Sequence, residues 1–222
     1  MKRSLLKAAF FVCSICLVAA ACTKYLTGSG AIITENRQVS AFDEVRIDGD
    51  ADLEIRQGTL QQVTVSGYEN LVPVYRTSVA NRLLVLGFND DVYNIRKNNI
   101  KVQVIVPDIK SVLIHGSGAV SINGFLTGTS LKIRINGSGN IDIGNSAFNK
   151  AAFEVNGSGN IRASAIPAGE VVADIHGSGN IEVNCLQKLT ARINGSGSID
   201  YWGSPGSVDT QISGNGRVRK RP

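Results

Sequence analysis

Short stretches in which apolar and polar residues alternate run along most of the chain, and glycine-rich segments separate them. Residues 131–135 read Leu-Lys-Ile-Arg-Ile, the segment Asn-Gly-Ser-Gly-Asn follows, and residues 141–143 read Ile-Asp-Ile. A period of two places every second side chain on the same face, which indicates short β-strands with one buried face and not helices. The pattern therefore predicts an all-β protein.

The glycine-rich segments recur with a regular phase. Five copies of Gly-Ser-Gly are spaced 18 to 21 residues apart, and a degenerate copy, Gly214-Asn215-Gly216, follows them. Glycine adopts positive φ without strain, and Asn tolerates it best among the other residues, so each copy is predicted to be a corner between two strands. The predicted corner glycines are Gly116, Gly118, Gly137, Gly139, Gly157, Gly159, Gly177, Gly179, Gly195 and Gly197.

Two architectures fit such repeats: a parallel β-solenoid with coils of about 20 residues, and an antiparallel β-sandwich or meander. If the coils stack in register, the exposed Arg134 lies beside Glu154, and the inward Ile135 lies on Val155. Opposite charges would then lie side by side, and aliphatic side chains would stack on aliphatic side chains. Both features favour the parallel β-solenoid. In that stack three equivalent asparagines would form a hydrogen-bonded ladder. They are Asn140, Asn160 and Asn180.

The region before the first copy holds a weaker version of the same pattern. Residues 42–55 alternate in the same way around a corner at Gly49. Further strands are predicted at residues 63–65, 83–85 and 100–106.

The first residues have the layout of a secretory signal, with basic residues before an apolar run that is too short to span a bilayer. Cys22 follows three alanines and resembles the lipobox cysteine of bacterial lipoproteins, which is acylated and becomes the mature N-terminus. Cleavage after Ala21 without acylation is the alternative. The expected division is a signal peptide over residues 1–21, a flexible polar tether over 22–37 and one repeat-built β domain over 38–222.

The charge of the chain is explained by its two ends. The 222 residues include 23 Lys and Arg against 18 Asp and Glu, a formal net charge of +5. Three of the basic residues fall in the predicted signal peptide, and four lie within the last six residues. The repeats carry no basic excess, so no nucleic-acid partner is expected.

The residue types that usually perform catalysis or bind metal form no set. The serine of Gly-Ser-Gly recurs equally in every copy, so no single serine is marked as a nucleophile. His115 and His176 occupy the same slot three copies apart, about 14 Å in a stack with a 4.8 Å repeat, which is too far for one metal ion. Cys185 is predicted to be a buried small side chain. We expect no catalytic residue, no metal and no cofactor.

Two groups of residues are candidates for ligand contact. The four acidic residues between Asp48 and Glu54 alternate along what is predicted to be one strand face. They could meet Ca²⁺ or a sugar, or simply be solvated. Tyr201 and Trp202 could stack on a sugar ring, but the favoured role is to close the final coil.

Three segments resemble a known family. They are the phased Asn-Gly-Ser-Gly-Asn-Ile copies, the opening Phe42-Asp-Glu-Val45 and the closing Tyr201-Trp-Gly-Ser-Pro205. These residues resemble the family called putative auto-transporter adhesin, head GIN domain, over about Ala41 to Val218. The resemblance implies a Gram-negative envelope protein, often a short lipoprotein, with a fold rich in β-solenoid character. The family name implies surface adhesion.

We therefore expect a non-catalytic binding or adhesion module, exported and lipid-anchored through Cys22 to the outer membrane, facing the periplasm or the cell surface. Its partners would be the membrane, through the anchor, and a glycan or an envelope protein; a homo-oligomer stays open. One alternative is a glycan-processing enzyme on a β-helix, which needs Asp or Glu side chains about 5–10 Å apart. The other is an envelope-stress or assembly module that binds a protein through an exposed apolar patch.

Overall fold

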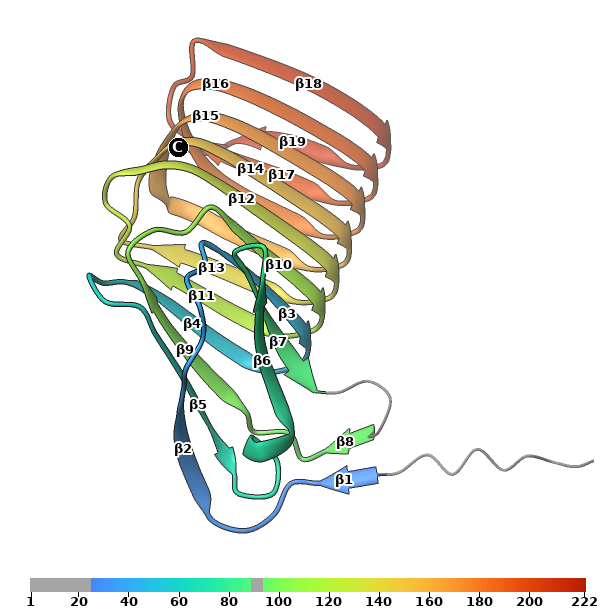
Figure 1. Ribbon diagram of the computed structural model, residues 1–222. Helices are drawn as coiled ribbons and strands as arrows, with labels where there is room; N and C mark the ends of the chain where they lie inside the picture. The colour runs from blue at the N-terminus through green and yellow to red at the C-terminus, as the bar shows by residue number, and fades with distance from the viewer. Residues whose placement is uncertain (1–24, 89–93) are drawn as a thin grey trace, which may run out of the picture.

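The computed structural model describes residues 25–88 and 94–222 and shows an all-β protein (Figure 1). The first strands are β1 Tyr25–Thr27, β2 Ile32–Arg37, β3 Glu44–Gly49, β4 Asp52–Gln57, β5 Gln62–Tyr68, β6 Tyr75–Ala80, β7 Leu83–Phe88, β8 Asn94–Arg96 and β9 Lys101–Val106, with the 3₁₀ helix η1 Val72–Val74 after β5. The strands of the repeats are β10 Ser111–Gly116, β11 Ala119–Asn123, β12 Gly128–Gly137, β13 Asn140–Gly144, β14 Phe148–Gly157, β15 Asn160–Gly177, β16 Asn180–Gly195, β17 Ser198–Trp202, β18 Ser207–Gly214 and β19 Arg217–Lys220.

The repeats stack as parallel coils, so the predicted β-solenoid is confirmed and the antiparallel alternative is wrong for this region. The strands other than β1 and β8 form one continuous sheet that encloses the core as two faces, and each corner carries the chain from one face to the other (Figure 1). The first, called the β10 sheet, has the order β6-β7-β3-β10-β12-β14-β15-β16-β18. The second, called the β11 sheet, has the order β2-β5-β9-β4-β11-β13-β15-β16-β17-β19. The long strands β15 and β16 contribute to both sheets.

Neighbouring coils are in register. Arg134 pairs with Glu154 across β12 and β14, and Ile135 pairs with Val155, as the alternating pattern predicted. The same inward column continues through Ile175 and Ile193, and all four of its side chains are at most 2% exposed. The core is therefore a stack of aliphatic side chains, each covered by its counterpart in the next coil.

The two glycines of each corner are required for different reasons. In the corner at Gly157 the first glycine has φ +136°, a conformation that L side chains rarely adopt. The N–H groups of Ser158 and Gly159 both donate to the carbonyl oxygen of Gly137 in the preceding coil, at 3.0 and 3.2 Å. Gly159 itself has no positive φ, but a Cβ there would collide with the carbonyl oxygen of Gly139. The first glycine is required because the corner needs a positive φ, and the second is required because there is no room for a side chain.

The N-terminal region departs from the coil pattern, because β2 and β5 extend the β11 sheet as antiparallel strands and β6 lies antiparallel to β7. The tether expected over residues 22–37 is therefore corrected from Tyr25 onward. β2 pairs with β5 along its whole length, and β1 pairs with β8. Leu26 and Ile33 also pack against the core. Backbone pairing and these apolar contacts fix a segment whose polar composition suggested flexibility.

Candidate functional site

The outer surface of the β11 sheet forms one continuous polar face. Every second residue of its strands points away from the core, and the strand registers align these residues in two rows. The first row is Thr34, Ser66, Lys101, Asp52, Ala119, Asn140, Asn160, Asn180, Ser198 and Arg217. The second row is Asn36, Thr64, Gln103, Glu54, Ser121, Asp142, Arg162, Glu182, Asp200 and Arg219. We call these two rows the polar face.

The three predicted ladder asparagines are neighbours in the first row. Asn160 Nδ2 donates to Asn140 Oδ1, and Asn180 Nδ2 donates to Asn160 Oδ1, both at 2.8 Å. A further amide contact that was not predicted lies on the β10 sheet, where Asn156 Nδ2 donates to Asn136 Oδ1 at 2.9 Å. Neither of these asparagines has positive φ, so their role before Gly-Ser-Gly is to join coils and not to relax the corner. Their recurrence in one slot was the signal that could have revealed it.

The polar face is hollowed where β4, β5, β9, β11 and β13 lie next to one another. The hollow has a volume of about 590 Å³. Its polar lining consists of Asp52, Glu54, Lys101, Asp142, Thr64, Ser66, Gln103 and Ser121. Carboxylates accept hydrogen bonds, an ammonium group donates them, and hydroxyl and amide groups do both. The hollow can therefore satisfy a ligand that carries many hydroxyl groups.

Glu54 lines this hollow and is held in place by hydrogen bonds. Its carboxylate accepts hydrogen bonds from Gln103 Nε2 at 3.1 Å and from Arg56 Nε at 2.7 Å. The hydrogen bond from Gln103 is the main cause that lowers the pKa of Glu54; burial opposes it and Arg56 adds to it. Asp52 and Lys101 face each other across β4 and β9, and no ion pair within the described residues involves either of them. Glu54 is thus a fixed anion beside two charges that a ligand can reach.

The four acidic residues between Asp48 and Glu54 do not share one face, so that expectation is wrong. The corner at Gly49 separates them: Asp48 lies on the β10 sheet with its Oδ1 3.3 Å from His115 Nδ1, whereas Asp52 and Glu54 lie on the polar face. His115 and His176 are three coils apart, as predicted. Within residues 25–88 and 94–222, no three His, Cys, Asp or Glu side chains are grouped to hold a metal ion.

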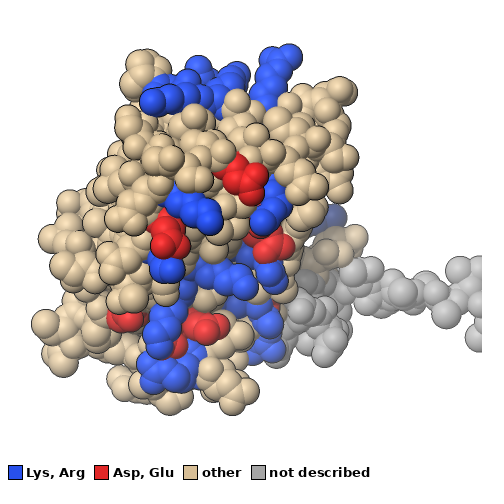
Figure 2. All heavy atoms as spheres, turned by 90° about the horizontal axis from the view of Figure 1, so that it is seen from above, with Lys and Arg blue, Asp and Glu red and all other residues tan. Residues whose placement is uncertain are grey.

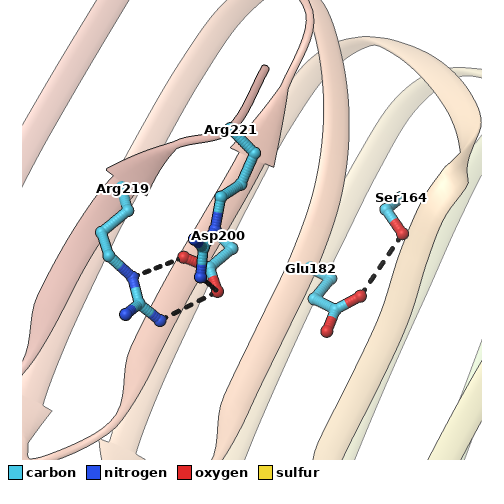
Figure 3. Close-up of polar contacts among 5 residues, drawn as sticks. All are labelled: Ser164, Glu182, Asp200, Arg219 and Arg221. Carbon is cyan, nitrogen blue, oxygen red and sulfur yellow. Dashed lines mark hydrogen bonds and ion pairs between the residues drawn. The ribbon is translucent and has the colours of Figure 1, made fainter.

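One carboxylate binds two arginines near the C-terminal end of the polar face (Figure 3). Asp200 accepts hydrogen bonds from Arg219 Nε and Nη2, at 2.7 and 3.0 Å, and from Arg221 Nη2 at 3.1 Å. Its neighbour Glu182 accepts one from Ser164 Oγ at 3.3 Å. Burial alone would raise the pKa of Asp200, but the two arginines more than offset it and hold that pKa below its usual value. The basic chain end is thus an ordered part of the last coil.

Replacing Asp200 with Asn is expected to lower the free energy of unfolding by about 1 kcal/mol at pH 7. A neutral amide then takes the place of the carboxylate that both arginines contact, and the loss is small because these contacts are partly solvated. Folding lowers the pKa of Asp200, so its contribution is complete above the unfolded pKa of about 4 and is lost as the pH falls through the folded pKa. Urea unfolding should show that wild type and D200N converge toward pH 2. An equal difference at pH 2 and pH 7 would contradict the assignment. D142N is the control, because the Asp142 carboxylate is 59% exposed and should lose less at pH 7.

The two cysteines singled out from the sequence fall in different places. Cys185 is buried, as its small-residue slot indicated, with Sγ 3.6 Å from the carbonyl oxygen of Gly169. Burial raises the pKa of its thiol, which keeps it in the less reactive protonated form and suits a packing role. Cys22 lies outside the described residues. None of the helical structure described for this chain is long and apolar enough to cross a membrane.

Several solved structures are similar to this chain. A putative adhesin from Bacteroides fragilis is 22% identical, with a TM-score of 0.72 over 88% of this chain and 100% of that one. A putative lipid binding protein from Parabacteroides distasonis is 26% identical, with a TM-score of 0.59 over 90% and 100%. A putative adhesin from Parabacteroides merdae is 21% identical, with a TM-score of 0.52 over 90% and 100%. No curated protein matches the chain.

A family model also matches the chain, over residues 41–152 and 145–205. These matches span the corner at Gly49, the phased Gly-Ser-Gly corners and the closing Tyr201-Trp202 segment. They include the strands that form the hollow, from β4 to β13. The chain therefore belongs to the family described as putative auto-transporter adhesin, head GIN domain.

Proposed function

We propose that the protein is a non-catalytic binding module of the cell envelope, anchored to the membrane through Cys22, and that its polar face binds a glycan. The hollow at Glu54 carries this proposal, because it brings carboxylate, ammonium, amide and hydroxyl groups together in about 590 Å³. Sugar hydroxyl groups donate and accept hydrogen bonds, and the lining offers partners of both kinds.

The rigidity of the polar face supports binding to an extended chain. Strand register fixes the spacing of its rows, and the coils repeat at about 4.8 Å, so a polymer lying along the stack meets equivalent positions in successive coils. A preordered surface loses little conformational entropy when it binds. The asparagine ladder contributes to this order, because its amides are already hydrogen-bonded to one another.

The names of the relatives agree with a binding role, since two are described as adhesins and one as a lipid binding protein. The space between the two sheets is filled by buried aliphatic side chains, so we expect the ligand on the outer surface. The lowered pKa of Glu54 suits a hydrogen-bond acceptor and does not suit the general acid of a glycosidase, which must carry a proton near neutral pH.

The test is a glycan array probed with the domain from Thr23 to Pro222. We expect a defined set of glycans to bind, and the double variant D52A/Q103A to weaken the affinity at least tenfold, because both side chains line the hollow. The matched control K132A/T190A changes two outward side chains of the opposite sheet and should bind as wild type does. Binding to no glycan, or an equal loss in both variants, would contradict the proposal. Release of shorter glycans would show the enzyme alternative.

A further inference from the structure

We propose that the first corner of the stack, where β3 leads into β4, binds the acetamido group of an N-acetylated amino sugar. A second pocket lies at this corner, with a volume of about 560 Å³, and it shares no lining residue with the hollow. The corner itself and side chains of β3, β7, β8 and β10 line it. We call it the corner pocket. It is a site beyond the one that the polar face provides.

The later corners show which contact the first corner is built to make. After the first glycine of each later corner, the next N–H group donates to the carbonyl oxygen of the first glycine in the coil before. In five of these six corners the following N–H group donates to the same oxygen. At the corner of Gly116, for example, Ser117 and Gly118 donate to the Gly49 oxygen at 3.0 and 3.1 Å. Two N–H groups thus converge on one oxygen atom.

The first corner keeps these two donors but has no coil before it. Gly49 aligns with Gly116, so the equivalent N–H groups belong to Asp50 and Ala51. Among the residues that the structure describes, no backbone oxygen accepts a hydrogen bond from either group. A Cβ at Gly116 would collide with the Gly49 oxygen, whereas no atom lies within 4 Å of the position of a Cβ at Gly49. The oxygen position is therefore open to a ligand, and its acceptor would satisfy both donors.

The other contacts beneath this corner are made by the N-terminal region. Ile100 O accepts a hydrogen bond from Asp52 N–H at 3.2 Å, as Gly139 O does from Asn160 N–H at 3.1 Å in a later corner. Asn98 Nδ2 donates to Asp50 Oδ1 at 2.6 Å, which holds that carboxylate in the pocket lining. The open position is thus confined to the oxygen of one missing glycine, with the Asp50 carboxylate in the same pocket.

The charges in the corner pocket select a neutral acceptor. Successive N–H groups often bind anions, but two carboxylates line this pocket and would repel one. Asp48 is already engaged, with its oxygens 3.1 Å from Arg46 Nη2 and 3.3 Å from His115 Nδ1. Asp50 has lone pairs left beyond its hydrogen bond from Asn98. A secondary amide fits both groups, because its C=O accepts from the two N–H groups and its N–H donates to Asp50.

A sugar fits this pocket better than a peptide strand. β3 pairs with β7 and β10, and β4 pairs with β9 and β11, so neither strand has a free edge to which an extended peptide could add. Phe88 and Ile95 form the apolar part of the lining. The Phe88 ring is packed edge-to-face on Tyr75, with ring centroids 5.0 Å apart. The methyl group of an acetamide and the apolar face of a sugar ring can pack against these side chains.

The test uses neutral sugars, because a charged sugar could also bind to the outer surface of the repeats, where Lys and Arg lie beside Asp and Glu (Figure 2). Methyl N-acetyl-β-glucosaminide is added to the isotope-labelled full-length protein in non-ionic detergent. NMR should show saturable shifts of the Asp50 and Ala51 amide signals. Methyl β-glucoside, which has a hydroxyl group in place of the acetamide, should bind at least tenfold more weakly. Equal binding of both sugars, no binding, or saturation without shifts of these two signals would overturn the proposal.

Two variants locate the site. Gly49→Ala places a methyl group against the open oxygen position and should weaken binding at least tenfold. Asp50→Ala removes the acceptor for the amide N–H and should weaken binding at least fivefold. The control for Asp50→Ala is Asp209→Ala, at an exposed acidic residue of the last coil, which should bind as wild type does. Circular dichroism verifies the fold of each variant. Binding that neither Gly49→Ala nor Asp50→Ala weakens would place the ligand elsewhere and overturn the proposal.

Two further measurements separate this site from its alternatives. N-acetylglycine methylamide has two secondary amides and no sugar ring, and it should bind at least tenfold more weakly than the acetylated sugar. Equal binding would assign the pocket to peptide amides and overturn the sugar as its ligand. The hollow variant D52A/Q103A should leave the shifts of the Asp50 and Ala51 signals unchanged. The corner pocket and the glycan proposal for the hollow can therefore fail independently.

Discussion

Replacing Gly157 with Ala is expected to destabilise the protein by about 4 kcal/mol or more, a loss typical of strain combined with a backbone collision. Gly157 has φ +136°, which alanine adopts only with strain. A Cβ at this position would also overlap the carbonyl oxygen of Gly137 in the preceding coil. That oxygen accepts hydrogen bonds from Ser158 and Gly159, so it cannot move aside without weakening the corner. Urea unfolding followed by circular dichroism measures the loss.

Gly49 provides the matched control, because it forms the corner of the first coil. It has φ +110°, yet no atom lies within 4 Å of the position that its Cβ would take. Gly49→Ala should therefore cost only the backbone strain, about 1–2 kcal/mol. The difference between the two variants measures the close approach of stacked coils. Equal losses at Gly157 and Gly49 would mean that the stack relaxes around a methyl group and that conformation alone explains the glycines.

The stacked coils could be predicted from the sequence because one environment repeats. A correct interpretation of a single coil, such as Leu131 to Ile143, extends to all its neighbours in register. The pairing of Arg134 with Glu154 then follows from the period of the repeat. Local alternation and glycine spacing therefore carried enough information to predict the parallel register of the repeats.

The hollow could not be predicted in the same way, because β5 and β9 are not copies of the repeat. Thr64 on β5 reaches the polar face only because β5 pairs antiparallel with β9, a long-range contact with no signal in the local pattern. The polar segment that forms β2 is similar: its alternation is weak, and only its pairing with β5 orders it. The acidic residues between Asp48 and Glu54 were misplaced because a corner interrupts their period.

The asparagine ladder shows why a repeated polar residue need not be a ligand site. Asn160 uses its amide nitrogen toward Asn140 and its carbonyl oxygen toward Asn180. One N–H and one lone pair of each interior amide are thus engaged within the stack. Within residues 25–88 and 94–222 no ion pair involves Asp52 or Lys101, which is why we assign binding to the hollow that they line and structural order to the stacked asparagines.

Replacing Phe153 with Ala is expected to cost about 3–5 kcal/mol, the range measured for large-to-small changes at buried aromatic positions. Phe153 is 2% exposed and lies in an inward column between Ile133 and Ala173. Ala173 and then Ala191 follow its ring in this column, so the side-chain volume falls along the column instead of staying the same. Because these neighbours are too small to fill the space, the cavity should remain after truncation. Urea unfolding of the variant gives the loss.

The double variant F153A/A173F tests whether positions 153 and 173 share one space in the core or are two independent sites. Ala173→Phe alone should destabilise the protein by about 1–3 kcal/mol or more, because it overpacks a column that already contains Phe153. If the two positions share one space, the double variant returns the ring to the same column and loses at least about 2 kcal/mol less than the sum of the single losses. Losses that add within about 0.5 kcal/mol would show that the positions do not couple. Coupling would mean that each coil is selected for its fit to the next, so that the stack, and not the single repeat, is the unit that packs.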